Sequence, residues 1–453
     1  MSVELAFAPI TELAEGLRNG AISATQLVEL YARRIEKLSD SSRAFISLDL
    51  EHACEQAAVI DATADNDTPL SGIPYACKDL FDVHGVATTG GSRVLDDNVA
   101  QQDAEAVARM NRAGAIFLGK NNLHEFAYGA TGENEIYGTP PNPYDATRLA
   151  GGSSSGSAAA LGYGLCAAAL GTDTGGSVRA PAALCGLVGF KPTFGRISTE
   201  GVIPYSWSLD HVGTLTRSAA DAAILFETLA ADNRKAEFTS LDKLTIGVPD
   251  AFFFERCEGE ILDGLERLMA FLRAAGAKLK PVVMPSMEFT RTVSLTVQMP
   301  EALSYHNRYL EQRGNLYSQD FRAGLALGQC LLAEQYIRAK RFVESYRRDM
   351  NRLFEDVDMI LTPATPVIAP PIGAVEVVVD GVAEPAGNAI TRYTSFFNMT
   401  GHPAITFPCA MHNEGLPIGA QLVGRQHADE ALIETTRLIE QDYDFELPLP
   451  DIA

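Results

Sequence analysis

Two glycine- and serine-rich turns near the middle of the chain place hydroxyl groups where they could act as nucleophiles. The first runs over 151–157 and the second over 171–177, and an apolar segment of small residues, 158–170, lies between them. Glycine lets the backbone turn sharply, and several N–H groups can then point toward one place, which is how an oxyanion hole is built. The pattern therefore indicates nucleophilic catalysis by a serine, with the intervening segment forming a buried helix that leads into a strand.

A serine hydroxyl is a weak nucleophile near neutral pH and needs a base beside it. The histidines are dispersed along the chain, and none belongs to a recognisable catalytic motif. Lys78 stands in the apolar context I-P-Y-A-C-K-D-L, which is unusual for a charged side chain. Burial without a full carboxylate partner would lower its pKa and make the neutral amine available as a base. The alternative is an ion pair with Asp79 or Asp82 at a surface turn, and composition alone leaves both open.

The central stretch resembles the amidase signature family. It reads G-G-S-S-S-G-S at 151–157 and G-T-D-T-G-G-S-V-R-A-P-A at 171–182, and Lys78 stands upstream in a G-I-P-x-x-x-K-D context. Lys78 and Ser153 are 75 positions apart, and Ser153 and Ser177 are 24 positions apart. The resemblance extends from residue 10 to residue 440 or so and is weakest over 284–345.

The resemblance implies a serine–cis-serine–lysine triad. Ser177 would attack the amide carbonyl, and Ser153, preceded by a cis peptide bond from Gly152, would bridge to Lys78. Lys78, neutral at rest, would draw the proton of Ser177 through Ser153 and return it to the leaving amine. The backbone N–H groups expected to hold the oxyanion are those of Thr174, Gly175, Gly176 and Ser177. The resemblance implies no cofactor and no metal ion.

Substrate contacts are expected from the loop-rich segment that precedes the first turn, at Ala127, Tyr128 and Gly129. Residues 205–207 and 392–396 are weaker candidates. Arg179 and Arg392 could each hold a substrate carboxylate through a bidentate pair, or could form a structural ion pair with a buried acid. The sequence leaves both roles open for each arginine.

The fold implied by the resemblance is a single large α/β/α domain over residues 1–453. Its central mixed, twisted β-sheet would have about eleven strands covered by helices on both faces. The alternation of helical segments with short apolar strands along the chain independently indicates the α/β class. A helical N-terminal segment, 1–65, is expected to pack on the sheet, with Ser23 as a helix N-cap. The variable region, 284–345, is expected to be mostly helical.

The expected activity is hydrolysis of the carbon–nitrogen bond of a small amide through an acyl-enzyme on Ser177, with release of ammonia or an amine and a carboxylic acid. The family also includes the A-type subunit of glutamine-dependent tRNA amidotransferases, which normally carries N-L-x-R-x-D-G-x-R-Y-G. The chain has P-E-A-L-S-Y-H-N-R-Y at 300–309, which disfavours that role. Hydrolysis of a urea-type amide such as carboxybiuret or allophanate is a more specific alternative activity.

The composition of the chain argues against some classes of binding partner. The net charge of −22 argues against nucleic-acid binding, and no apolar run approaches the roughly 18 residues of a membrane helix. The seven scattered cysteines and the absence of an apolar signal core at the N-terminus are typical of a reducing cytoplasm. A small-molecule amide is the expected partner, and the sequence leaves a homodimer open.

Two interpretations from other classes compete with an amidase. A catalytically silent scaffold would not need Lys78, Ser153 and Ser177 together. A nucleotide-binding protein could use the glycine turns as a phosphate cradle, but the near match at 114–121, G-A-I-F-L-G-K-N, lacks the final Ser or Thr and is apolar inside.

Overall fold

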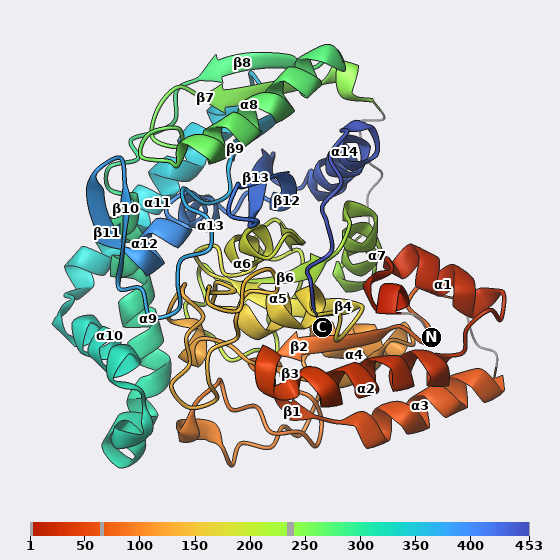
Figure 1. Ribbon diagram of the computed structural model, residues 1–453. Helices are drawn as coiled ribbons and strands as arrows, with labels where there is room; N and C mark the ends of the chain where they lie inside the picture. Colours follow the sequence, from red (N-terminus) through yellow and green to blue (C-terminus); the bar gives the residue numbers. More distant parts are fainter. Residues whose placement is uncertain (1–2, 64–67, 233–239, 453) are drawn as a thin grey trace.

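The computed structural model describes residues 3–63, 68–232 and 240–452 and is built on an 11-stranded sheet of order β1-β3-β2-β4-β6-β5-β12-β13-β9-β7-β8 (Figure 1). The strands are, in chain order, β1 (Phe45–Leu48), β2 (Pro74–Lys78), β3 (Ile116–Asn121), β4 (Ala168–Asp173), β5 (Val188–Lys191), β6 (His211–Thr216), β7 (Thr245–Pro249), β8 (Lys278–Val282), β9 (Met359–Pro363), β12 (Ala404–Met411) and β13 (Pro417–Gly424).

The sheet is mixed. Strand β2 runs parallel to β3 and β4, and β7 runs parallel to β8 and β9, whereas the other neighbouring pairs are antiparallel. The strand count and the mixed direction implied by the resemblance are therefore confirmed. A separate two-stranded hairpin, β10 (Glu376–Val379) and β11 (Val382–Pro385), lies outside the sheet.

Helices cover both faces of the sheet, and two neighbouring residues of β13 show this. A side chain at Gly419 would meet Ala183 of α6, while Ile418 lies beside Gly264 of α8. Successive strand residues point to opposite faces, so α6 and α8 lie on opposite sides. The α-helices are α1 (Ile10–Arg18), α2 (Ala24–Ser42), α3 (Leu50–Thr63), α4 (Glu105–Arg112), α5 (Ser155–Gly162), α6 (Arg179–Leu184), α7 (Ala219–Leu229), α8 (Gly259–Ala274), α9 (Thr290–Arg313), α10 (Gln319–Cys330), α11 (Ala333–Leu353), α12 (Ala386–Thr391), α13 (Ser395–Thr400) and α14 (Asp429–Asp442).

The N-terminal segment was expected to be helical, and α1, α2 and α3 confirm this for its described part, since residues 1–2 and 64–65 lie outside the described residues. Ser23 caps α2 as expected, because its side chain accepts a hydrogen bond from Gln26 N. The segment also contributes an unexpected edge strand, β1, which pairs antiparallel with β3. Four residues are too few for a period-two pattern to stand out in the sequence.

The segment between the two glycine turns forms a helix and then a strand, as predicted. Helix α5 begins at Ser155, three residues earlier than the apolar run, and β4 carries the chain to Asp173. The hydroxyls of Ser155 and Ser157 donate to the carbonyls of Gly132 and Leu170, so both satisfy backbone groups. The α5–β4 unit thus delivers one glycine turn to each of its ends.

The variable region forms α9, α10 and most of α11, which lie together on one side of the molecule (Figure 1). Among the described residues, no helix is both long enough and apolar enough to cross a membrane. The single-domain organisation stays a prediction, with which the continuous sheet is consistent.

Candidate active site

Lys78 is the last residue of β2 and is fully buried. Its Nζ donates to Ser153 Oγ at 2.7 Å and to Thr172 Oγ1 at 2.8 Å. Within the described residues it makes no ion pair, because the neighbouring Asp79 pairs instead with Lys120 at 2.8 Å. Burial lowers the pKa of Lys78 to about 7, and the nearby carboxylates of Asp173 and Asp210 only partly oppose this shift.

Ser153 lies in the first glycine turn, and the peptide bond between Gly152 and Ser153 is cis, as the resemblance implied. The side chain of Ser153 is fully buried beside Lys78. The next residue, Ser154, donates its backbone N–H to the carbonyl of Ser177 at 3.2 Å. The two glycine turns are therefore joined directly, which places Ser177 next to the lysine–serine pair.

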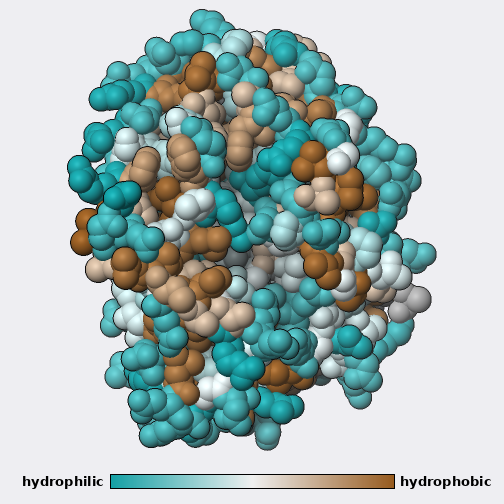
Figure 2. Space-filling model, turned by 90° about the vertical axis from the view of Figure 1, so that its left-hand side faces the viewer, coloured by the Kyte–Doolittle hydropathy of each residue, from teal (hydrophilic) through white to brown (hydrophobic). Residues whose placement is uncertain are grey.

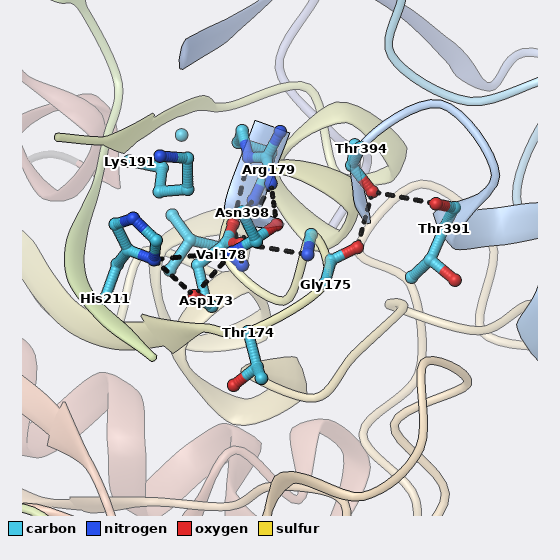
Figure 3. A network of polar contacts seen from close by, with 12 residues as sticks. Asp173, Thr174, Gly175, Val178, Arg179, Lys191, His211, Thr391, Thr394 and Asn398 are labelled. Carbon is cyan, nitrogen blue, oxygen red and sulfur yellow. Dashed lines mark hydrogen bonds and ion pairs between the residues drawn. The ribbon is translucent and has the colours of Figure 1, made fainter. Parts of the chain in front are cut away.

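The carboxylate of Asp173 holds the second glycine turn in place (Figure 3). Its oxygens accept hydrogen bonds from the backbone N–H groups of Gly176 at 2.9 Å and Val178 at 3.1 Å. The turn is fixed from the other side by Thr394, whose hydroxyl donates to the carbonyl of Gly175 at 2.7 Å. Gly176 has φ +125°, and any Cβ there would collide with Thr394 Oγ1, so only glycine fits.

This contact corrects the predicted oxyanion hole at one position. The N–H of Gly176 points at Asp173 and is already used, so it is not a free donor for a substrate oxygen. The N–H groups of Thr174, Gly175 and Ser177 have no hydrogen-bond partner among the described residues. These three remain the predicted donors, because the carboxylate at the base of the turn captures the fourth.

Arg179 is fully buried and pairs with Asp173 at 2.9 Å. Its remaining donors reach Gln421 Oε1 and Asn398 Oδ1, each at 2.7 Å (Figure 3). Burial alone would raise the pKa of Asp173, but the charge and hydrogen bonds of Arg179, aided by Lys191 and Asn398, hold that pKa below its usual range. Of the two roles left open for Arg179, the geometry favours the structural ion pair, because its donors are occupied and it does not line the cavity.

A cavity of about 630 Å³ opens in front of Ser177, and Thr174 and Gly175 line it as well. Figure 2 shows the side of the molecule that carries α9, α10 and the β10–β11 hairpin, where the surface is hollowed near the centre. The predicted contact residues Ala127, Tyr128 and Gly129 all lie in its wall. A volume of this size suits a small organic ligand.

The weaker substrate-contact candidates divide between three cavities. Tyr205 and Ser395 border the cavity of Ser177, whereas Trp207 is half-exposed and borders a smaller one of about 230 Å³. Arg392 borders a third cavity and forms an ion pair with Glu384, and its Nη1 donates to the carbonyl of Arg256 at 3.0 Å. The structure thus places Arg392 away from Ser177, and the structural ion pair is the favoured role here too.

The histidines do not form a catalytic pair with either serine. His211 is buried behind the second turn, where its Nδ1 lies 2.7 Å from the carbonyl of Leu209. Burial, reinforced by the charge of Lys191, lowers its pKa well below the usual value, and burial lowers the pKa of His402 to about 3. Among the described residues, no group of His, Cys, Asp and Glu side chains could hold a metal ion.

Sequence reasoning missed several polar residues of the site. Thr172 accepts from Lys78, and Asp210 accepts from Thr174 Oγ1 at 2.5 Å. Helix α9 adds Arg291, Ser294 and Gln298 to the cavity wall. Their spacing of three and four residues on one helix face is a signal that could have been read, although the helix lies where the family resemblance is weakest.

Comparisons with known proteins agree with this geometry. The sequence model of the family described as Amidase matches residues 26–433. The A-type subunit of the glutamyl-tRNA(Gln) amidotransferase of Coxiella burnetii is 34% identical over an alignment of 484 positions, which covers 98% of this chain and 99% of that protein.

Solved structures of amidases and related proteins are also similar to this chain. A crystal structure described as an amidase has a TM-score of 0.91 and 34% identity, covering 96% of this chain and 99% of that one. A protein from a complex related to the origins of an s-triazine catabolic enzyme has a TM-score of 0.92 and 32% identity, covering 97% and 100%. The A-type subunit of the glutamyl-tRNA(Gln) amidotransferase of Thermotoga maritima has a TM-score of 0.83 and 29% identity, covering 100% and 99%.

Proposed function

Because the chain belongs to the amidase family, we propose that it hydrolyses a small amide through an acyl-enzyme on Ser177. As a member of that family, it is a hydrolase acting on carbon–nitrogen bonds other than peptide bonds. The observation that carries the proposal is the 2.7 Å contact between Lys78 Nζ and Ser153 Oγ, since it links a buried amine of lowered pKa to the turn beside Ser177.

In the first half of the reaction, neutral Lys78 accepts the proton of Ser153 Oγ while Ser153 accepts the proton of Ser177 Oγ. Ser177 Oγ then bonds to the carbonyl carbon, and the electron pair of the C=O bond moves to the oxygen. When the C–N bond breaks, the proton returns along the same path to the leaving nitrogen, which departs as ammonia or an amine. The Ser177 hydroxyl makes no hydrogen bond to another described residue, so its alignment with Ser153 comes when substrate binds, as is common for catalytic hydrogen bonds.

In the second half, water takes the place of the amine. Lys78 draws a proton from water through Ser153, and the water oxygen bonds to the acyl carbon. The ester bond of Ser177 then breaks, the proton returns through Ser153 to Ser177 Oγ, and the carboxylic acid is released. The N–H groups of Thr174, Gly175 and Ser177 stabilise the negative oxygen in both halves, and losing one such donor costs about 3 kcal/mol of barrier.

A second candidate function is that of the A-type subunit of a glutamine-dependent tRNA amidotransferase. The 34% identity to proteins with that name, over 98% of the chain, favours it. The sequence P-E-A-L-S-Y-H-N-R-Y at 300–309, in place of the motif typical of that subunit, disfavours it. A urea-type amide such as carboxybiuret or allophanate is a narrower version of the main proposal, supported by the 32% identity to the protein connected with s-triazine catabolism.

The test is ammonia release from a panel of aliphatic, aromatic, half-amide and ureido compounds and glutamine, by wild type and by Ser177→Ala. Turnover of a small amide that disappears in Ser177→Ala supports the proposal. Turnover that survives in Ser177→Ala refutes the mechanism. Hydrolysis of glutamine alone, and only when partner subunits are co-expressed, would establish the amidotransferase role instead.

The remaining expectations accompany this proposal. The partner is a small-molecule amide, the machinery uses no cofactor, and the protein acts in the cytoplasm. Whether the protein forms a homodimer is left open, and size-exclusion chromatography with light scattering measures its oligomeric state.

A further inference from the structure

Arg291 lies in the wall of the Ser177 cavity, and its charged side chain has no ion-pair partner among the described residues. It lies in the first turn of α9, and its guanidinium makes no hydrogen bond or ion pair with any described residue. The side chain is solvent-accessible, yet enough protein surrounds it that burial lowers its pKa. Its guanidinium carries a fork of donors that is available to whatever enters the cavity.

Arg291 borders the Ser177 cavity together with two tyrosines, Tyr205 and Tyr128. Arg291 also borders a second cavity of about 650 Å³, which is lined by the carboxylates of Asp250, Glu255, Glu288 and Glu384. Burial lowers the pKa of Arg291, and Tyr205 and Tyr128, which both line the Ser177 cavity, lie near enough to oppose that shift. The arginine and the two tyrosines therefore form one cluster.

Tyr205 brings a second unsatisfied donor to that cluster. Its side chain is 3% exposed, and its hydroxyl has no hydrogen-bond partner among the described residues. A buried hydroxyl without a partner is destabilising, and a ligand acceptor would remove that cost. The ring of Tyr128 packs edge-on against Tyr205, with centroids 6.2 Å apart, which fixes both rings beside Arg291.

Three of the four acids that line the Ser177 cavity already have partners. Glu125 accepts from Ser92 Oγ and from the backbone N–H of Ser318. Asp320 lies 3.6 Å from His124 Nε2, and Glu133 accepts from the backbone N–H of Gly373. Glu135 is exposed. None of these carboxylates forms an ion pair with Arg291, so its guanidinium stays available to a ligand in the cavity.

The position of Arg291 along α9 separates its backbone from the part of the helix that lies beside the second glycine turn. Gln298, on the same helix, lies beside Gly175, because a Cβ at Gly175 would be 3.8 Å from Gln298 Nε2. Arg291 precedes Gln298 by seven residues, which is about 10 Å along a helix with a rise of 1.5 Å per residue. A ligand that spans both points needs a chain of several atoms between them.

We propose that Arg291, with the hydroxyls of Tyr205 and Tyr128, binds a carboxylate of the substrate, so that the preferred amide carries an anionic group several bonds from the scissile carbonyl. This inference rests on the proposed function, and it narrows the substrate class to ω-carboxy amides or molecules of the same charge and length. The carboxylate accepts from the guanidinium in a bidentate pair and from the tyrosine hydroxyls.

The test compares adipamic acid, the monoamide of a six-carbon diacid, with hexanamide, which has the same length and no charge. Wild type should show a kcat/KM at least 10-fold higher for adipamic acid, and succinamic acid, which is shorter, should fall below it. Arg291→Met should remove the preference through a rise in KM of about 10- to 100-fold for adipamic acid, and Arg291→Lys should restore part of it. Arg341→Met, an exposed arginine of α11, should keep the wild-type preference.

Binding is measured separately, by calorimetry of adipamic acid with Ser177→Ala and with the double variant Ser177→Ala/Arg291→Met. Loss of binding in the double variant supports the inference even if wild type hydrolyses no amide, an outcome in which only the proposed function fails. Equal binding by both variants, or an equal loss of turnover of both substrates in Arg291→Met, overturns the carboxylate site. A wild-type enzyme that prefers hexanamide overturns it as well.

Discussion

Replacement of Lys78 by methionine tests the electrostatic basis of the site. The methionine keeps the length of the side chain but removes the amine that contacts Ser153 and Thr172. Removal of a general base slows an enzyme by 10²- to 10⁴-fold. We therefore expect kcat/KM to fall by about 10³-fold, and wild-type kcat/KM to rise tenfold per pH unit until it levels off near pH 7, where the amine of Lys78 becomes neutral.

The same substitution has a predictable effect on stability. In the unfolded chain Lys78 binds its proton up to a pKa of 10.5, whereas in the folded protein that pKa is about 7. The unfolded state therefore holds more protons between these values, and burial of Lys78 destabilises the fold fully below pH 7 and not at all above pH 10.5. At about 1.4 kcal/mol per pKa unit, the total effect is on the order of 5 kcal/mol.

Lys78→Met lacks this penalty, so its stability relative to wild type should improve by about 1.4 kcal/mol for each pH unit between pH 9 and pH 7. Urea denaturation of both proteins over that range measures the difference, and other titrating groups cancel. Lys120→Met is the matched control, because Lys120 is equally buried but pairs with Asp79. That variant should lose about 3–5 kcal/mol, since it leaves a buried carboxylate alone. A stability difference between Lys78→Met and wild type that does not change with pH would refute the assignment of Lys78 as a neutral amine.

Three further predictions follow from the packing around the second glycine turn and from the thiols. Arg179→Met should lower the free energy of unfolding by about 3–5 kcal/mol, because Asp173 loses its buried partner, and thermal denaturation measures it; an unchanged melting temperature with a higher KM would instead identify Arg179 as a substrate ligand. Gly176→Ala should lower kcat by at least about 10²-fold through displacement of the oxyanion donors, because its Cβ collides with Thr394, and full activity in a steady-state assay would contradict this. Thiol titration of the native protein should label Cys54 and Cys330, the two exposed cysteines, and leave the five buried ones, whereas labelling of a third thiol would be inconsistent with the described burial.

The sequence allowed the lysine and both serines to be predicted because each stands in a long motif of fixed spacing. The glycine turns also predicted a helix followed by a strand, and α5 and β4 confirm it. Two partners of Arg179 could not be predicted, because Asn398 and Gln421 lie more than 200 positions further along the chain. The choice between its two roles also required the course of the turn that brings Arg179 back onto Asp173.

Two other features needed the folded chain. The capture of the Gly176 N–H by Asp173 depends on the exact course of one turn, which a motif does not specify. Arg291 lies on a helix for which the family resemblance gives little guidance, and only the packing of α9 against the cavity brings it near Tyr205 and Tyr128. Polar residues of a cavity wall that come from distant elements are therefore the part of this site that sequence reasoning could not assemble.

The central claim is that the acyl group passes through Ser177, and intact mass spectrometry after rapid acid quench tests it most directly. Wild type mixed with the best amide of the panel should gain the mass of the acyl group, and peptide mapping should place it on Ser177. Ser177→Ala should gain no mass and release no ammonia. An acyl group on any other residue, or ammonia release that persists in Ser177→Ala, would contradict the account.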